Sequence, residues 1–462
     1  MEDGNTREKS IQRTSYNFVE GSIWKGIIRM SWPMLFIMLF NFAVGFTDIY
    51  VAGLIGPDIQ AAVGLVEQLY FLLIIFGNAI SIGTVAIVSR AAGAEDMPSA
   101  ETSARQSMGL GLIVSVILAS VGAFAPEVIV LAVGVPPELH RIATVFVRIY
   151  ALALGFNYLL IISNAVLRAL GAPEKPMVSM AVYALLNVIL DFSLVFGWYP
   201  FPAMGFRGIP MATAISVTAA MGVNIWFLAR LHWPGFFRRL LTLSLSFVRR
   251  IIGVSWPMAL VMLAWNAGTL VLYYILSHLK EHHIEVMAAY ANGYRIEAII
   301  FLPAFALNNA GAVLVGQNLG AGKPERAVRV GWQIALTAAT LLGVVSGVLY
   351  IYAWDVARIL AKDTLVLAET VTYLRYNLIA EPFMAVSLAL GGGLQGAGDT
   401  KGVLAVIVAA MWLIRLPLAY ILGVTLEWGP PGVWTAMIAS MTIQGSLMAL
   451  RFHLGKWKTA DV

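Results

Sequence analysis

The chain of 462 residues is 60% hydrophobic and only 12% charged, with a formal net charge of +5. Soluble globular proteins carry about 25% charged residues, so no soluble fold of this length could bury so much apolar surface. The sequence contains no cysteine, which excludes disulfides and thiolate metal sites.

Long runs without Asp, Glu, Lys or Arg predict helices that cross a membrane, because roughly 20 apolar residues span the hydrocarbon core. Residues 1–26 come before the first run; they are polar and lack the basic-then-apolar pattern of a signal peptide. We therefore expect a cytoplasmic tail, followed by a first span that acts as its own insertion signal. The predicted spans, in chain order, are 27–54, 61–89, 106–125, 143–167, 176–197, 209–230, 251–279, 286–315, 329–353, 369–394, 402–423 and 431–451.

The distribution of basic residues supports twelve spans with both termini in the cytoplasm. With that topology, 21 of the 30 Lys and Arg residues lie in or at the edges of the two tails and the even-numbered loops. Cytoplasmic loops of membrane proteins carry this excess of positive charge. The sequence therefore predicts a multi-pass protein of the cell membrane with both ends inside.

Four short motifs occur twice, at offsets of 224 or 227 residues. They predict two similar halves in the same orientation, that is, an all-α polytopic fold of twelve transmembrane helices in two pseudo-symmetric six-helix bundles. The pairs are 31–34 with 255–258 (Ser-Trp-Pro-Met in both), 91–94 with 318–321 (Gly93 over Gly320), 167–171 with 394–398, and 208–216 with 432–440.

The duplication also predicts the domain organisation. The expected parts are a tail (1–26), a first bundle (27–231), a basic cytoplasmic linker (232–250), a second bundle (251–451) and a C-terminal tail (452–462). Repeats in parallel orientation suit a transporter whose halves rock about a shared site. A channel is the weaker alternative, because gated pores are more often built from symmetric oligomers.

Two acids within predicted spans are the main candidates for a functional site, since buried charge in a membrane is costly. Asp48 lies 19 residues beyond Arg29, or roughly 28 Å along its helix, and Asp191 reaches a similar depth. Asn187 is one helical turn before Asp191, and Thr213 sits near the same outer side. Two carboxylates close together in low dielectric cannot both ionise easily, so the pair is a candidate proton site. With the amide and hydroxyl oxygens of Asn187 and Thr213, it is also a possible sodium site.

Several motifs resemble MATE (multidrug and toxic compound extrusion) transporters. They include Gly-Gln-Asn-Leu-Gly-Ala-Gly-Lys at 316–323, Tyr-Arg-Ile-Glu at 294–297, Arg-Leu-Pro-Leu at 415–418, Phe-Thr-Asp at 46–48 and Asn-Val-Ile-Leu-Asp at 187–191. The resemblance covers nearly the whole chain in order. It implies an antiporter that exports organic cations and amphiphilic drugs in exchange for protons or sodium ions.

The closest resemblance is to the archaeal and DinF-like branch of that family. It implies that Asp48, Asp191, Asn187, Thr213 and Asn164 form the ion-coupling and substrate site. The NorM-like branch carries acids in helices 7 and 10 of the second half. In this sequence the helix 7 position is Trp265 and the segment 382–398 has no acid, so we expect coupling to depend on the first half.

Other polar residues are secondary candidates. Arg295 and Glu297 are two residues apart on one helix and are expected to point in different directions. Arg415, before Pro417, suggests a structural role at a helix break, and Glu381, before Pro382, suggests a charge at a helix end. Pro33 removes a backbone hydrogen bond and is expected to permit a bend in the first helix.

No ATP-binding or enzymatic motif accompanies these residues, so we expect no cofactor, no resident metal and an ion gradient as the source of energy. The expected partners are small organic cations and membrane lipid, without nucleic acid, and we expect a monomer. The alternatives are a lipid-linked oligosaccharide flippase of the same broad superfamily, a channel and, least of all, a membrane enzyme. The flippase would need several cationic residues in its cavity, whereas the first half offers acids.

Overall fold

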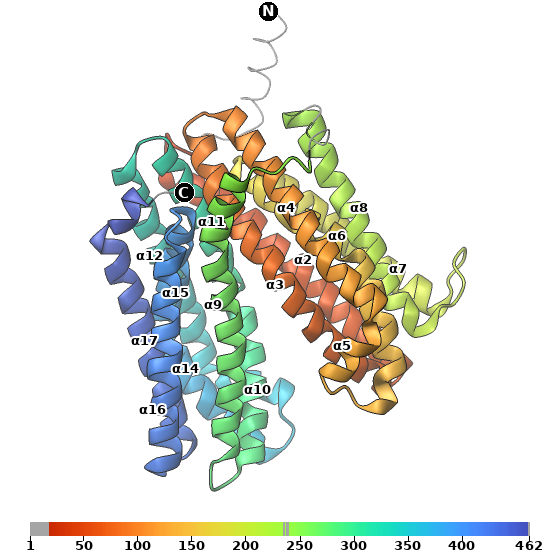
Figure 1. Ribbon diagram of the computed structural model, residues 1–462. Coiled ribbons are helices and arrows are strands. Elements are labelled where there is room, and N and C mark those ends of the chain that lie inside the picture. The colour runs from red at the N-terminus through yellow and green to blue at the C-terminus, as the bar shows by residue number, and fades with distance from the viewer. Residues whose placement is uncertain (1–17, 234–235, 237–239, 461–462) are drawn as a thin grey trace, which may run out of the picture. The chain divides into compact units, whose positions relative to one another are not determined.

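The computed structural model describes residues 18–233, 236 and 240–460, and every regular element among them is helical. Twelve spans were predicted. The described residues contain eleven helices long and apolar enough to cross a membrane, or twelve if one bent pair counts as a span. The predicted all-α polytopic fold is therefore confirmed (Figure 1).

The helices of the first half include all six predicted spans. They are α2 (Ile23–Ile55), α3 (Pro57–Gly93), α4 (Met97–Phe124), the short α5 (Pro126–Ala132), α6 (His140–Ala169), α7 (Glu174–Phe196) and α8 (Gly208–Phe227). Short 3-10 segments lie at Pro137–Leu139 and Gly205–Arg207, and a π-helical turn at Leu228–His232.

The helices of the second half follow the same order. They are α9 (Leu245–Ser277), α10 (His283–Ile300), α11 (Leu302–Gly320), α12 (Pro324–Ile351), the short α13 (Ala353–Leu360), α14 (Thr364–Gly396), α15 (Thr400–Val408), α16 (Leu416–Tyr420) and α17 (Pro430–Leu454), with a 3-10 turn at Lys456–Thr459. The short helices α5 and α13 were not predicted, because seven or eight residues are too few to form a recognisable span.

The chain divides into two compact units. Among the described residues, one contains 18–20 and 32–255, and the other contains 21–31 and 256–460. Two of the three divisions fall inside helices, one near the start of α2 and one in α9, and each of these helices contains a proline of the repeated motif, Pro33 or Pro257. Neither helix is interrupted at its proline.

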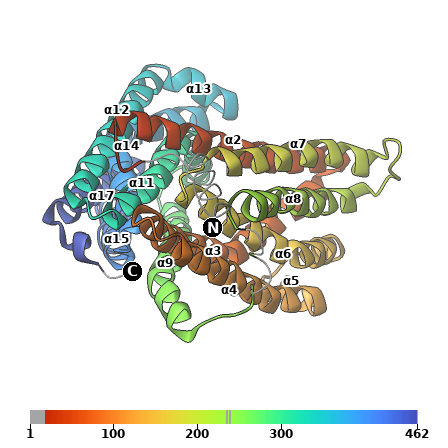
Figure 2. The ribbon, with the colours of Figure 1, turned by 90° about the horizontal axis from the view of Figure 1, so that it is seen from above.

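In the first unit, α6 packs against α3, α4 and α8, and α7 packs along α8 (Figure 2). The helix ends near the predicted acids are held by one apolar cluster. It includes Val51 and Ala52 of α2, Val63 and Val66 of α3, and Phe146 of α6, all buried. Helices α3 and α6 are thereby fixed against the end of α2, where Asp48 lies.

In the second unit, α14 is the central helix and packs against α10, α11, α12 and α17. Its glycines make this close packing possible. A Cβ at Gly392 would overlap the backbone of Asn308, and one at Gly396 would overlap the backbone of Ala312. The run of glycines at 391–393 therefore serves helix packing.

Two predicted spans are irregular. The span predicted at 286–315 consists of α10 and α11, which meet at an angle of 46° where Pro303 lies in the first turn of α11. Proline lacks the N–H group that would continue the ladder of the preceding helix. The helix break expected near Pro417 is instead two π-helical segments, Ala409–Arg415 and Ile421–Thr425, on either side of α16.

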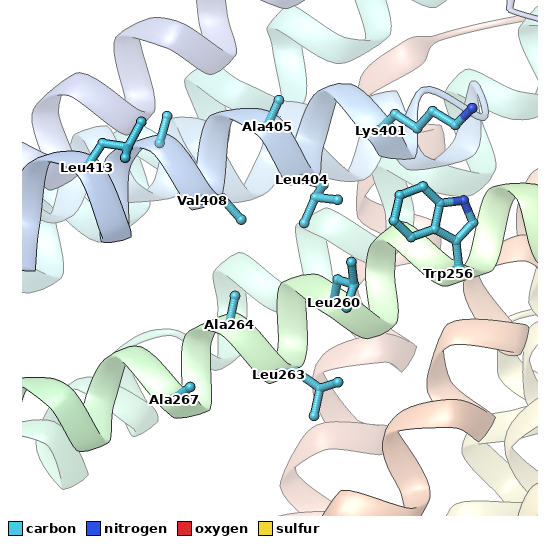
Figure 3. A pocket seen from close by; sticks show the side chains of 11 residues that line it. Trp256, Leu260, Leu263, Ala264, Ala267, Lys401, Leu404, Ala405, Val408 and Leu413 are labelled. Carbon is cyan, nitrogen blue, oxygen red and sulfur yellow. The ribbon is translucent and has the colours of Figure 1, made fainter.

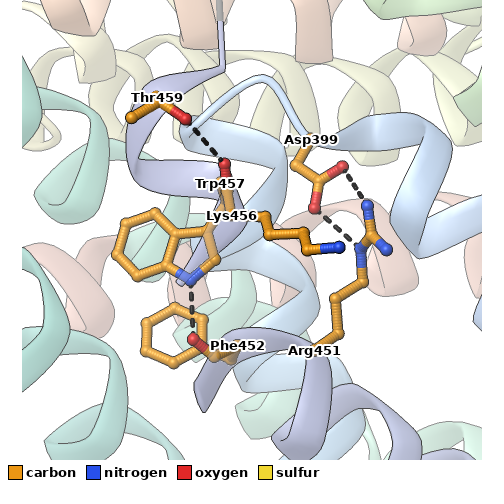
Figure 4. A network of polar contacts seen from close by, with 6 residues as sticks. All are labelled: Asp399, Arg451, Phe452, Lys456, Trp457 and Thr459. Atoms are coloured by element: carbon orange, nitrogen blue, oxygen red, sulfur yellow. Dashed lines mark hydrogen bonds and ion pairs between the residues drawn. The ribbon is translucent and has the colours of Figure 1, made fainter. Parts of the chain in front are cut away.

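A polar network joins the loop before α15 to the end of α17 (Figure 4). Arg451 donates from Nε and Nη2 to the two carboxylate oxygens of Asp399, at 2.8 and 2.7 Å. Beside it, the Trp457 indole donates to the Phe452 carbonyl at 2.7 Å and the two rings stack. These contacts fix the C-terminal end of α17 to the rest of the second unit.

Candidate functional site

The four polar residues predicted at the outer half of the first bundle lie near the same ends of their helices. Asp48 is seven residues from the end of α2 and Asp191 five from the end of α7, or about 10 and 8 Å along the helices. Thr213 is five residues into α8. Because α7 packs along α8, and Thr213 of α8 is hydrogen-bonded to Asp48 of α2, these positions reach a common depth.

A chain of hydrogen bonds connects three of these residues. The Thr213 hydroxyl donates to Asp48 Oδ2 at 3.3 Å, and the Asn187 amide donates to Thr213 Oγ1, also at 3.3 Å. The carboxyl groups of Asp48 and Asp191 interact with each other. Asp191 and Asn187 are fully buried and Asp48 is 3% exposed. The structure thus brings Asp48, Asp191, Asn187 and Thr213 together from three helices.

This group contains several buried oxygen atoms that no protein donor satisfies. They are Asp48 Oδ1, Asn187 Oδ1 and both carboxylate oxygens of Asp191. A buried oxygen without a partner costs free energy, and such atoms call for a proton or a cation as partner. Oxygens of this kind are the ligands that hard cations prefer. The donor set therefore fits either a shared proton or a small cation.

The sequence analysis missed a third acid near this group, Glu67 of α3. Its carboxylate interacts electrostatically with those of Asp48 and Asp191, and with the hydroxyls of Tyr150 and Tyr183. In the described part of the chain, no three or more His, Cys, Asp or Glu side chains are close enough to hold one metal ion. Glu67 is thus a neighbour of the Asp48–Asp191 pair and does not share a metal site with it. Its position within a predicted span was the signal that could have identified it.

Asn164, the remaining residue implied by the family resemblance, belongs to a different cluster. Its side-chain oxygen accepts hydrogen bonds from Asn224 at 2.7 Å and from Ser179 at 3.3 Å. Both partners are buried, and Asn224 also donates to Ser163. These bonds connect α6, α7 and α8 and leave Asn164 outside the group around Asp48.

The second unit has a polar cluster of its own. Glu297 of α10 and Glu381 of α14 are buried, and both interact with the guanidinium group of Arg415. Arg415 donates from Nε to the Ser440 hydroxyl at 2.7 Å and lies over the Trp265 ring at 5.6 Å. The acids of this half therefore have a positive charge beside them.

Two expectations for the second half can now be compared with its structure. Arg295 is exposed whereas Glu297 is buried, so the two point in different directions, as predicted. The interpretation of Glu381 as a charge at a helix end is wrong, since it lies in the middle of α14 and is fully buried. The following Pro382 is accommodated within the helix and does not end it.

The second unit also contains an apolar pocket between α9 and the span that begins with α15 (Figure 3). Its volume is about 730 Å³, and Lys401 is the one charged residue in its lining. The lining residues are Trp256, Leu260, Leu263, Ala264, Ala267, Lys401, Leu404, Ala405, Val408, Ala409 and Leu413. Its apolar character contrasts with the acidic group of the first unit.

A family model for MatE matches residues 33–193 and 257–421, one segment in each half. The chain belongs to the MatE family. It is accordingly a multi-pass membrane transporter of the multidrug efflux type and not an enzyme. The predicted family is confirmed at this level.

Relatives in other organisms are similar over almost their whole length. The chain is 25% identical over 444 residues to a probable multidrug resistance protein NorM of Thermotoga maritima, covering 95% of this chain and 94% of the relative. It is also 25% identical to the multidrug resistance protein PmpM of Pseudomonas aeruginosa, covering 92% and 90%.

Solved structures have the same fold. A crystal structure described as MATE in the bent conformation matches with a TM-score of 0.86 at 20% identity, covering 97% of this chain and 98% of the other. A MOP superfamily transporter from Pyrococcus furiosus matches with a TM-score of 0.85 at 19% identity, covering 95% and 96%. At this identity the match establishes the fold.

Proposed function

We propose that this MATE transporter is a secondary antiporter that exports organic cations and amphiphilic drugs in exchange for protons or sodium ions. The observation that carries the proposal is the group of buried, unpartnered oxygens at Asp48, Asn187 and Asp191. Such a group needs a positively charged partner. If that partner is an ion that binds from one side of the membrane and is released on the other, the site is coupled to the ion gradient.

In the proposed cycle, Asp48 and Asp191 work as one unit. A proton or sodium ion from outside neutralises the pair, and the organic cation loses its electrostatic partner and leaves. After the transporter turns inward, the ion is released and the restored negative charge favours the next substrate. Each ligand lowers the affinity for the other to the same extent, as linkage requires. We further propose that Pro33 permits a bend in α2 that shifts Asp48 relative to Asp191.

The branch and the topology are also proposals. The set Asp48, Asn187, Asp191 and Thr213, together with Trp265 where the NorM-like branch has an acid, supports the DinF-like and archaeal branch. The bias of basic residues supports a protein of the cell membrane with both termini and the linker 232–250 in the cytoplasm. We propose that the monomer is the functional form.

The function is tested with purified protein in liposomes under separately imposed gradients. A cationic dye should move uphill when a proton gradient, a sodium gradient or both are applied, and should equilibrate passively when both are absent. The active gradient identifies the coupling ion. Dye movement that ignores both gradients would reject the antiporter.

The topology is tested by labelling, and the natural absence of cysteine makes the background clean. Ser244 and Glu281 are both exposed, so a cysteine at either position is accessible from its own side of the membrane. In intact cells, a membrane-impermeant thiol reagent should label Glu281→Cys and leave Ser244→Cys and Ser10→Cys unlabelled. Labelling of Ser244→Cys from outside would contradict the twelve-span topology.

A further inference from the structure

Glu67 shares a helix face with residues that form the core around Asp48. Val63 and Val66 of α3 are buried in that core, and Tyr70, three residues after Glu67, packs against it. Residues three and four apart lie on one side of a helix. Glu67 therefore lies on the side of α3 that packs against the helix ends carrying the aspartates, which accounts for its electrostatic interaction with both of them.

Three tyrosines surround this part of the first unit. Tyr70 and Tyr150 stack with ring centroids 4.7 Å apart, and Tyr150 and Tyr183, both buried, lie within electrostatic range of Glu67 and Asp48. The faces of tyrosine rings carry negative potential and attract cations. Carboxylates and aromatic rings together are the combination that recognises an organic cation.

No basic side chain offsets these acids. In the described residues, neither Lys nor Arg pairs with Asp48, Asp191 or Glu67. Asp191 is fully buried, and both its carboxylate oxygens lack a hydrogen-bond partner. The positive charge that balances the three acids must come from ligands.

Exposure separates the three acids into two kinds. Asp48 and Asp191 are buried, so only a small ion such as a proton or Na⁺ reaches them without rearrangement of the helices. Glu67 is partly exposed. It lies about 15 Å along α3 from the start of that helix, farther from the helix ends than Asp48 and Asp191 are. A bulky cation can approach a partly exposed carboxylate.

We propose that Glu67 holds the charged centre of the transported organic cation, with the tyrosines beside it, while Asp48 and Asp191 hold the coupling ion. This inference rests on the proposed antiport function and assigns its two ligands to separate carboxylates. When the coupling ion binds to the aspartate pair, its positive charge lowers the affinity of the neighbouring Glu67 site for the organic cation. The two ligands therefore oppose each other's binding without occupying the same place.

The test compares a cation with an uncharged analogue of similar size, tetraphenylphosphonium with triphenylphosphine oxide, by equilibrium binding to purified protein. Glu67→Gln should weaken tetraphenylphosphonium binding about tenfold and leave triphenylphosphine oxide binding unchanged. Glu67→Asp, which keeps the charge, should recover most of the difference. Glu127→Gln is the matched control, because Glu127 is an exposed acid paired with Arg148 in the same unit.

Each other outcome would overturn the assignment. If Glu67→Gln weakens the binding of both compounds equally, Glu67 has a structural role. If the binding of both is unchanged, Glu67 is not part of the substrate site. A loss of ion-driven flux in Glu67→Gln with cation binding intact would place Glu67 at the coupling site. Failure of the antiport function itself would be visible separately, as wild-type protein that binds the cation but shows no gradient-driven flux.

Discussion

The two halves of this transporter have the same helices in the same order but opposite charge at an equivalent position. The offset of 224 residues that relates 208–216 to 432–440 also aligns Asp191 with Arg415. By the same offset, Asn187 and Thr213 align with Met411 and Met437. At these three positions the first half has oxygen-bearing side chains, whereas the second half has an arginine and two methionines. Fold alone does not place the site.

A count of buried acids does not distinguish the halves, whereas their partners do. In the second half, Glu297 and Glu381 interact with Arg415, which is itself buried and bonded to Ser440. In the first half, the aspartates interact with each other, with the acid Glu67 and with neutral groups, and with no basic side chain among the described residues. A buried acid with a fixed positive partner is balanced by the protein, and one without such a partner is available to a mobile ion.

The largest effect is expected from neutralising the first-half pair. Asp48→Asn and Asp191→Asn should each reduce ion-coupled efflux of a cationic dye from liposomes to the level of empty vesicles, because the coupling ion loses its carboxylate. Both variants should still be folded and inserted, since an amide is easier to bury than a carboxylate. The measurement is dye efflux under an imposed proton or sodium gradient, with size-exclusion profiles as the check on folding.

Glu127→Gln provides the control, as it removes an exposed acid of the same unit that pairs with Arg148. It should transport at the wild-type rate. Native-rate export by either aspartate variant would mean that the coupling site lies elsewhere, and the contrast between the halves would lose its functional meaning.

The next largest effect is a loss of stability when the buried positive charge of the second half, Arg415, is removed. Arg415→Met leaves Glu297 and Glu381 buried without their positive partner, which should cost about 3–5 kcal/mol in unfolding free energy. The loss is measured as a lower unfolding temperature in detergent. Adding Glu381→Gln to Arg415→Met should recover part of it, because one uncompensated carboxylate is removed. An unchanged unfolding temperature in Arg415→Met would show that these acids are not balanced by Arg415.

A smaller effect on transport is expected from the acids of the second half. Glu297→Gln and Glu381→Gln should slow efflux less than Asp48→Asn or Asp191→Asn at matched expression, because Arg415 already offsets their charge. The comparison is made with the same dye and the same gradient. A Glu297→Gln variant that binds substrate normally but loses all ion dependence would reverse the roles assigned to the two halves.

The sequence was sufficient to predict the fold and one part of the site. Hydropathy located every long span, because the bilayer dictates both length and composition, although α4 begins at Met97, nine residues before the predicted start. Asp48, Asp191, Asn187 and Thr213 could be brought together by counting helical rise. Glu67 escaped this reasoning because its relation to Asp48 depends on how α3 is rotated. Glu381 was misinterpreted because the proline after it suggested a helix end, whereas the surrounding helices keep α14 continuous.

The smallest effect contrasts an ion pair from each half. Arg451 makes a two-pronged bond to Asp399, which is only 12% exposed, whereas Arg148 and Glu127 are 53% and 60% exposed and joined by a single contact of 3.2 Å. Two parallel hydrogen bonds to one carboxylate are stronger and more strictly oriented than a single one. Solvent-exposed ion pairs contribute little to the free energy of unfolding. Arg451→Met should therefore lower the unfolding free energy by about 1 kcal/mol, and Arg148→Met by a few tenths at most. Unfolding in detergent at low and high salt measures both, and the loss from Arg451→Met should persist at high salt because Asp399 is largely shielded from solvent. Equal losses in the two variants would mean that the Asp399–Arg451 pair does not fix the end of α17, and that the second half owes its stability to helix packing alone.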